Sequence, residues 1–287
     1  MTLRLVASRH SAFYTPFIGA VEFLRRAGID ASYRPMASGE TTAALLGQGL
    51  ADVVQSSVST NWALMDKGVT DLPLHFALIN QRDGFYLVRK GGQSSFSWHE
   101  LEGRKLLADH GRQPLAMLKF AVLHNGADWG RITLIDAGSP EMMAAAFVSG
   151  EGDYVHLQAP GPQLLSESGS GQAVVSVGAA MPPNAFSTVC ASRGFIGTTE
   201  FHEFTSAFSA AKRWAADTDP REIAAALRQF FPEVNLNSLS AAIESYQKLG
   251  TWEGAMEISR ALYEQTLDVF EAAGALARRY PWEEICV

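Results

Sequence analysis

The sequence predicts an α/β protein of two βαβαβ-type lobes joined by two hinge crossings, with C-terminal helices packed on the first lobe. Three observations support this fold class: an internal repeat, two pairs of apolar segments able to connect the halves, and a change to a helical pattern from Thr199 onward. The 287 residues are enough for two cores of ordinary size. We expect lobe 1 to comprise residues 1–83 and 188–287, and lobe 2 residues 84–187.

The repeat relates two regions of the chain at a constant offset. SGETTAALLGQGLADVV (38–54) aligns with SPEMMAAAFVSGEGDYV (139–155), an offset of 101 positions because 139 − 38 = 101. At the same offset, RLVASRH (4–10) aligns with KLLADHG (105–111). Two separate segments that keep one offset indicate that the same supersecondary unit occurs twice.

Each copy has the pattern strand, helix, strand, helix, strand. The first helices, within 15–28 and 113–127, have proline near the first turn and glycine at the end, which are the usual start and stop signals. The second strands are expected in DASYRP (30–35) and RITLID (131–136), and the third strands in DVVQSS (52–57) and DYVHLQ (153–158).

The remaining segments predict the crossings and the C-terminal helices. Two apolar strands surround Arg82, Asp83 and Gly84, and AVVSVG (173–178) is followed by the turn MPPNA and the strand FSTVCAS (186–192). We expect the hinges near 83–86 and 183–187. From residue 199 to about 277 the chain predicts four helices, the last starting near 252, and their apolar spacing indicates one buried face each.

Composition excludes several classes of protein. A net charge of −7 without a basic stripe argues against nucleic acid as a partner, and no apolar run approaches the roughly 20 residues of a membrane span. Cys190 and Cys286 are the only thiols and lack the spacing of a metal site. The sequence also has no Walker loop, GxGxxG or HExxH motif, so we expect no cofactor and no metal. The first residues enter a strand without the features of a secretory signal, which predicts a cytoplasmic protein as written, or a periplasmic one if Met1 replaces a removed signal.

The repeat also predicts where a ligand would bind. In parallel α/β sheets ligands lie beyond the carboxyl ends of the strands, and both copies direct these ends toward one cleft between the lobes. The candidate residues are Arg9, His10, Phe13, Tyr14, Ser38, Gly39, Thr41, Gln55, Ser56 and Ser57 in lobe 1, His110, Arg112, Gln113, Ser139, His156 and Gln158 in lobe 2, and Asn184 in the second crossing.

Several of these residue types suit an anionic group. Ser38 and Ser139 precede helices whose free N–H groups attract anions, although serine also occurs at such positions simply as a cap. Arg9 and Arg112 would add charge-assisted hydrogen bonds to a carboxylate, sulfonate or phosphate, unless they are ordinary solvated loop charges.

Aromatic and histidine side chains allow further interpretations. Phe13 and Tyr14 would stack on a flat ligand or line the lobe. His10, His110 and His156 would converge on the cleft and form a metal or acid–base site, an interpretation disfavoured because the sequence shows no partner residues for it.

The order of these segments resembles a known group of proteins. The segments that show the resemblance are the opening strand with Pro16, the strand GIDASYRP, the helix ending GQGLADVV, the segment WHELEGRKLLAD, SGEGDYV followed by QAP (158–160), and the helix start DPRE (219–222). Together they resemble the type II periplasmic-binding-protein fold, and specifically the NMT1/THI5-like (SsuA-like) substrate-binding proteins of nitrate, sulfonate and thiamine-precursor ABC transporters. The resemblance covers nearly the whole chain. It departs from the group at 158–160, where transporter receptors often have Trp-Glu-Pro.

The resemblance implies a solute-binding protein that closes over a small polar or anionic organic molecule and delivers it to ABC transporter membrane subunits. The alternative is a cytoplasmic enzyme on the same fold, of the thiamine-pyrimidine, desulfinase or lyase type. The synthase type would require a histidine near Lys67 and the desulfinase type a cysteine in the loop 9–14, and neither is present. A sensor that signals by closure is a third possibility. We therefore assign no catalytic residue.

Overall fold

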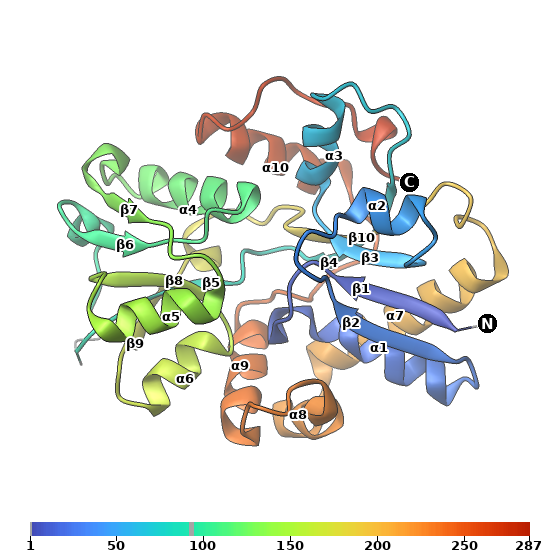
Figure 1. Ribbon diagram of the computed structural model, residues 1–287, viewed down its shortest axis with the longest axis horizontal. Coiled ribbons are helices and arrows are strands. Elements are labelled where there is room, and N and C mark those ends of the chain that lie inside the picture. Colours follow the sequence, from blue (N-terminus) through green and yellow to red (C-terminus); the bar gives the residue numbers. More distant parts are fainter. Residues whose placement is uncertain (1, 92–94) are drawn as a thin grey trace.

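A computed structural model describes residues 2–91 and 95–287 as two five-stranded sheets with helices on their faces (Figure 1). The strand order is β2-β1-β3-β10-β4 in the first sheet and β7-β6-β8-β5-β9 in the second. Each sheet with its own helices is called lobe 1 or lobe 2 below. The predicted fold class is confirmed, including the two crossings between the lobes.

Lobe 1 is formed by both ends of the chain. Its strands are β1 (Leu3–Ala7), β2 (Ala31–Pro35), β3 (Val53–Ser56), β4 (Leu74–Asn80) and β10 (Ser187–Ala191). Strands β1, β2 and β3 are parallel, whereas β10 runs antiparallel between β3 and β4. The helical elements within its first half are η1 (Ala12–Tyr14), α1 (Thr15–Arg26), α2 (Thr42–Gly47) and α3 (Val58–Met65).

Lobe 2 repeats this arrangement. Its strands are β5 (Phe85–Arg89), β6 (Lys105–Leu107), β7 (Thr133–Ile135), β8 (Tyr154–Gln158) and β9 (Gln172–Ser176), with β5 antiparallel between β8 and β9. The helical elements are η2 (Trp98–Leu101), α4 (Arg112–His124), η3 (Trp129–Arg131), α5 (Pro140–Ser149), α6 (Gly161–Glu167) and η4 (Gly178–Ala180).

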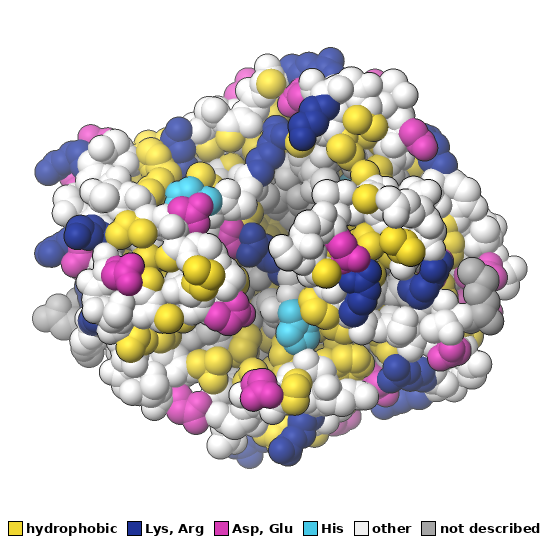
Figure 2. Space-filling model, viewed as in Figure 1, with side chains coloured by type: hydrophobic (Ala, Val, Ile, Leu, Met, Phe, Trp, Pro, Cys, Tyr) yellow, Lys and Arg dark blue, Asp and Glu magenta, His cyan; other side chains and the backbone are white. Residues whose placement is uncertain are grey.

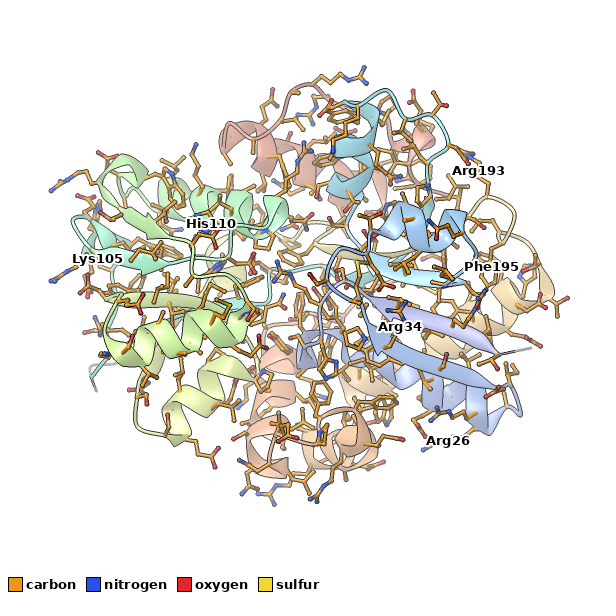
Figure 3. The ribbon with its side chains drawn as sticks, viewed as in Figure 1. Arg26, Arg34, Lys105, His110, Arg193 and Phe195 are labelled. Atoms are coloured by element: carbon orange, nitrogen blue, oxygen red, sulfur yellow. The ribbon has the colours of Figure 1, made fainter. Side chains whose placement is uncertain are left out.

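One repeated aspartate has the same structural role in both lobes. The Asp52 carboxylate accepts a hydrogen bond of 2.7 Å from the Arg4 backbone N–H, and Asp153 accepts one of 2.8 Å from the Lys105 N–H. The backbone N–H of each aspartate donates back to the carbonyl of the same partner. Lys105 lies on the outer side of its lobe, whereas His110, beyond the end of β6, lies nearer the other lobe (Figure 3). The aspartate thus joins the first and third strands at their outer ends.

The second helices of the two copies differ in their starts. Ser139 caps α5, since its side chain accepts a hydrogen bond from the Met142 N–H. In the first copy Thr41 is the cap of α2, and Ser38 is exposed in the loop before it. The sequence match therefore extends over a position whose backbone differs between the lobes.

The two crossings lie side by side. The Asn184 N–H donates to the Gln81 carbonyl at 2.9 Å, which joins the second crossing to the first. The contact is tightest between Asp83 and Gly178, where a Cβ atom on the glycine would lie 2.1 Å from the Asp83 carbonyl oxygen. The lobe boundaries at 83/84 and 187/188 remain our proposed division of the chain.

The C-terminal part contains α7 (Thr199–Asp217), α8 (Pro220–Leu227), η5 (Arg228–Phe230), α9 (Leu236–Lys248), α10 (Arg260–Ala272) and η6 (Trp282–Glu284). Helix α7 packs along α1 of lobe 1, whereas α9 also contacts α6 and α10 also contacts α4, both in lobe 2. Figure 1 shows α9 and α10 on opposite sides of the junction. Within 2–91 and 95–287, no helix combines the length and apolar character that a membrane span requires.

The predicted start of the last helix near residue 252 is wrong. Helix α10 begins at Arg260, with Ser259 as its cap. Gly254 has φ of +80°, a left-handed conformation that interrupts a helix and suits glycine. Residues 251–259 therefore form a connection rather than the first turns of α10.

Replacing Gly178 with alanine is expected to destabilise the protein. The new methyl group would meet the Asp83 carbonyl oxygen, a backbone atom that cannot rotate away. We expect a loss of about 1–3 kcal/mol in the free energy of unfolding, the usual cost of overpacking, measured by urea denaturation. Gly194→Ala, where a Cβ would meet nothing within 4 Å, is the matched control. Equal stability of the two variants would contradict this packing.

Replacing Asp83 with asparagine is expected to change the pH dependence of stability. Burial raises the pKa of Asp83 from its ordinary value of 3.8 to about 7, so the folded protein retains a proton that the unfolded chain loses. The free energy of unfolding of the wild-type protein should therefore decrease as the pH rises from about 4 to 7, because the unfolded chain releases this proton while the folded protein still holds it. The stability of Asp83→Asn relative to wild type should increase over that range and level off above it. Urea denaturation at about pH 4, 6 and 8 measures this, with the exposed Asp217→Asn as control; a difference independent of pH would refute the shift.

Candidate ligand-binding cleft

A cleft of about 1360 Å³ lies between the two lobes. Figure 2 shows the hollow in the middle of this face, with hydrophobic side chains gathered along part of its edge. The volume exceeds what a simple oxyanion needs and suits an organic molecule. The loops after β1, β3, β6 and β8 contribute to its wall, as predicted from the strand ends.

The structure brings seven of the predicted residues together at this cleft. Three come from lobe 1 and four from lobe 2: Arg9, His10, Ser57, Arg112, Gln113, Ser139 and Gln158. Both copies of the repeat thus supply side chains to one site.

Phe13 and Tyr14 lie in the core rather than in the cleft wall. The turn η1 places the Phe13 ring in the junction between the lobes, with centroids 5.4 Å from Phe186 and 5.0 Å from Tyr246. Packing is so close that a Cβ atom on Gly84 would lie 2.4 Å from the ring. Tyr14 is also buried, and burial raises the pKa of its phenol to about 12.

The polar residues at the end of β3 form hydrogen bonds with neighbouring residues of lobe 1. Gln55 is buried, and its side-chain oxygen accepts hydrogen bonds from the backbone N–H and the hydroxyl of Ser8, at 3.0 and 2.7 Å. Ser56 is buried as well and donates to the Thr60 hydroxyl at 3.2 Å. Gln55 therefore fixes the loop that carries Arg9 and does not itself reach the cleft.

The predicted site residues before α2 are exposed to solvent and do not line the cleft. Ser38, Gly39 and Thr41 precede a helix that starts only at Thr42. Pro35, the last residue of β2, and Met36, which follows it, line the cleft in their place.

The histidines do not converge. The His110 Nδ1–H donates to the Ala108 carbonyl, 2.8 Å away, and this nitrogen lies 3.9 Å from the Asp136 carboxylate. His156 is buried against the Phe85 ring at a centroid distance of 4.2 Å, and burial lowers its pKa to about 3. Within the described residues no group of three or more His, Cys, Asp or Glu side chains is placed to hold a metal ion.

Asn184 lies within the second crossing. It is buried, and its side-chain amide donates to the Pro182 carbonyl at 3.2 Å. This residue holds the turn in the crossing and is absent from the cleft wall.

An ion pair crosses the cleft between Arg9 and Asp109. The two terminal nitrogens of the guanidinium contact the two carboxylate oxygens at 2.8 and 2.5 Å. Asp109 is only 5% exposed and also accepts a hydrogen bond of 2.8 Å from the Gly111 N–H. Sequence reasoning missed Asp109, although the repeat aligns it with Ser8, since 8 + 101 = 109.

Arg112 also reaches from lobe 2 toward lobe 1. Its guanidinium lies 3.9 Å from the Asp66 carboxylate and 6.0 Å from the centre of the Phe270 ring. Both arginines of the cleft therefore have a carboxylate of the opposite lobe nearby.

Uncharged hydrogen bonds join the lobes on the floor of the cleft. The Ser11 hydroxyl donates to the Ala159 carbonyl at 2.6 Å, and the Ser59 hydroxyl donates to the Gln113 side-chain oxygen at 3.0 Å. The Tyr246 hydroxyl accepts from the Ala159 N–H and donates to the Gly84 carbonyl. These contacts hold the two lobes together beneath the cleft.

One part of the wall that sequence reasoning missed is the segment Phe230–Val234. It connects η5 with α9 and lines the cleft together with α6 of lobe 2. The C-terminal helices were expected only to pack on lobe 1. The adjacent Phe230 and Phe231, followed by Pro232 at a helix end, were the available signal.

The chain was compared with known protein families, curated proteins and solved structures. No family model matches it. YtlA of Bacillus subtilis (strain 168), which carries a provisional description as a binding protein, is 24% identical over 282 residues, covering 96% of this chain and 84% of YtlA.

Among solved structures, the ligand-binding component of an ABC-type import system from Staphylococcus aureus, with zinc bound, has a TM-score of 0.81 and 11% identity, covering 100% of this chain and 96% of its own. The alkanesulfonate-binding protein SsuA from Xanthomonas axonopodis pv. citri, bound to MOPS, has a TM-score of 0.73 and 14% identity, covering 100% and 98%. The predicted resemblance to SsuA-like proteins is thus confirmed at the level of fold. This chain has the fold of the periplasmic binding proteins.

Proposed function

We propose that this protein is the solute-binding component of an ABC import system, whose lobes close over an organic molecule. The observation that carries the proposal is a cleft of about 1360 Å³ walled by equivalent loops of both lobes, with the lobes joined by two adjacent crossings. That arrangement permits opening and closure about a hinge. YtlA and the import-system components of the same fold support this function over the enzymatic alternative.

The proposal includes a partner. A receptor of this kind would deliver its ligand to the membrane subunits of a transporter, and we propose such subunits as the partner of the closed form. The predicted ligand class, a small polar or anionic molecule such as a sulfonate, nitrate or a thiamine precursor, remains a prediction.

Ligand removal is expected to open the lobes. Ser38 and Ser166 are exposed, one in each lobe, and Cys190 and Cys286 are buried, so cysteines introduced at the two serines can be labelled selectively with fluorescent dyes. Protein refolded free of small molecules should show a longer distance between the dyes than protein supplied with the small-molecule fraction released from the purified material. Single-molecule energy transfer measures the distance.

A pair of dyes within lobe 1 is the control for this experiment. Ser38→Cys combined with Asp217→Cys places both dyes on the same lobe, so the distance between them should stay constant. An interlobe distance that does not respond to the released fraction would contradict the receptor function.

A further inference from the structure

The Arg9 guanidinium of the cleft is already paired with a carboxylate. Both terminal nitrogens of Arg9 contact the Asp109 carboxylate. An anionic ligand at Arg9 would displace a carboxylate that is 5% exposed and would leave it buried without its guanidinium. Removing one partner of a buried pair is costly because the remaining charge loses its compensation. Arg9 is therefore a poor anchor for an anion while Asp109 is in place.

The other charges of the wall do not reverse this balance. Arg112 has the Asp66 carboxylate 3.9 Å away, and Glu141 and Glu233 also line the cleft. Burial lowers the pKa of His10, which keeps its imidazole neutral near pH 7. An anion would enter a cleft where carboxylates match or outnumber guanidinium groups, and the resulting potential opposes it.

Most of the remaining wall is apolar. It includes Met36, Phe85, Leu157, Leu164, Phe230 and Val234, contributed by both lobes and by the segment before α9. Uncharged hydrogen-bonding groups are provided by the hydroxyls of Ser57, Thr60 and Ser168. Apolar walls with a few uncharged polar groups favour an organic ligand that buries apolar surface and carries no net negative charge.

The geometry points to an uncharged, mainly apolar organic molecule as the ligand, with Asp109 as the residue that sets this preference by occupying Arg9. This inference rests on the proposed function, because it concerns the ligand of the same cleft. It departs from the predicted polar or anionic class, because it excludes anions and assigns most of the contact surface to apolar groups. Asp109 acts through Arg9 and is thus a specificity-determining residue that need not touch the ligand.

Two fluorescent probes that share one apolar body test the inference. N-phenyl-1-naphthylamine is uncharged, and 8-anilino-1-naphthalenesulfonate carries a sulfonate on the same anilinonaphthalene frame. Wild-type protein should bind the uncharged probe at least about tenfold more tightly in fluorescence titrations. Asp109→Asn, which frees Arg9, should raise the affinity for the sulfonate probe by about tenfold and leave that for the uncharged probe nearly unchanged.

Three variants serve as controls. They separate the effect of charge from that of lobe closure, and they show whether the probes bind in the cleft. Glu244→Gln removes an exposed carboxylate outside the cleft and should not change the ratio of the two affinities. Ser59→Ala removes a cross-cleft hydrogen bond without a charge change and should shift both affinities together. Ala144→Trp fills the cleft from α5 and should abolish binding of both probes.

Several outcomes would overturn the inference. Wild-type protein that binds the sulfonate probe as tightly as the uncharged one, or fails to bind the uncharged probe, contradicts the ligand class. An unchanged ratio in a folded Asp109→Asn variant contradicts the role of Asp109. If that variant does not fold, Glu141→Gln, at an exposed residue of the wall, should move the ratio in the same direction.

Different measurements would contradict the receptor function and the ligand class. If the uncharged probe binds but the interlobe distance between dyes at Ser38 and Ser166 stays constant, the receptor function fails and the ligand class stands. If the distance shortens with the sulfonate probe in preference to the uncharged one, the ligand class fails and the receptor function stands.

Discussion

The close contact between the two crossings constrains everything else in this protein. Strand β4, at the edge of the first sheet, leads into β5 inside the second, and β9, at the edge of the second, leads into β10 inside the first. Asp83 and Gly178 pack backbone against backbone where these connections meet. Two adjacent crossings suit rotation of the lobes about this junction, which is the motion that the proposed function requires to open and close the cleft.

The internal repeat explains why the cleft is built from matching parts. Parallel strands place the loops after their carboxyl ends at one edge of a sheet, and the two edges face each other across the junction. The Arg9–Asp109 pair joins positions that differ by one residue in the repeat, because Ser8 aligns with Asp109 and Arg9 with His110. The ion pair is thus a contact between almost equivalent loops, which carry opposite charges in this chain.

Much of the fold could be predicted from sequence because its signals are local or periodic. The constant offset identified both copies, and Arg9, Arg112 and Gln113 were found at the cleft because they lie in the loop after β1 and in the first turn of α4, the helix that follows β6. His156 was misplaced because β8 is buried on both faces, which leaves no alternation to show that the residue points into the core. Phe13 is in the junction because the short turn η1 redirects the chain, and no sequence pattern specifies that direction.

The rest of the site depends on tertiary contacts that sequence does not encode locally. Phe230 and Phe231 line the cleft from the segment before α9, with their rings against Tyr33 and His10 of lobe 1, and α9 itself packs beside α6 of lobe 2. The pairing of Asp109 with Arg9 spans the cleft and depends on how far the lobes close. The sequence therefore predicts which strand ends face the ligand, whereas the charge available to the ligand is set by packing between the lobes.

Native mass spectrometry of the freshly purified protein, beside its denatured mass, tests the central claim most directly. A small organic molecule retained in the native protein, lost on denaturation and absent from Ala144→Trp is the result we predict. The exposed Ala241→Trp variant should retain the molecule, because α9 presents this residue to solvent. Wild-type and Ala144→Trp proteins that retain the same molecule in equal amounts would show that the cleft is not the binding site.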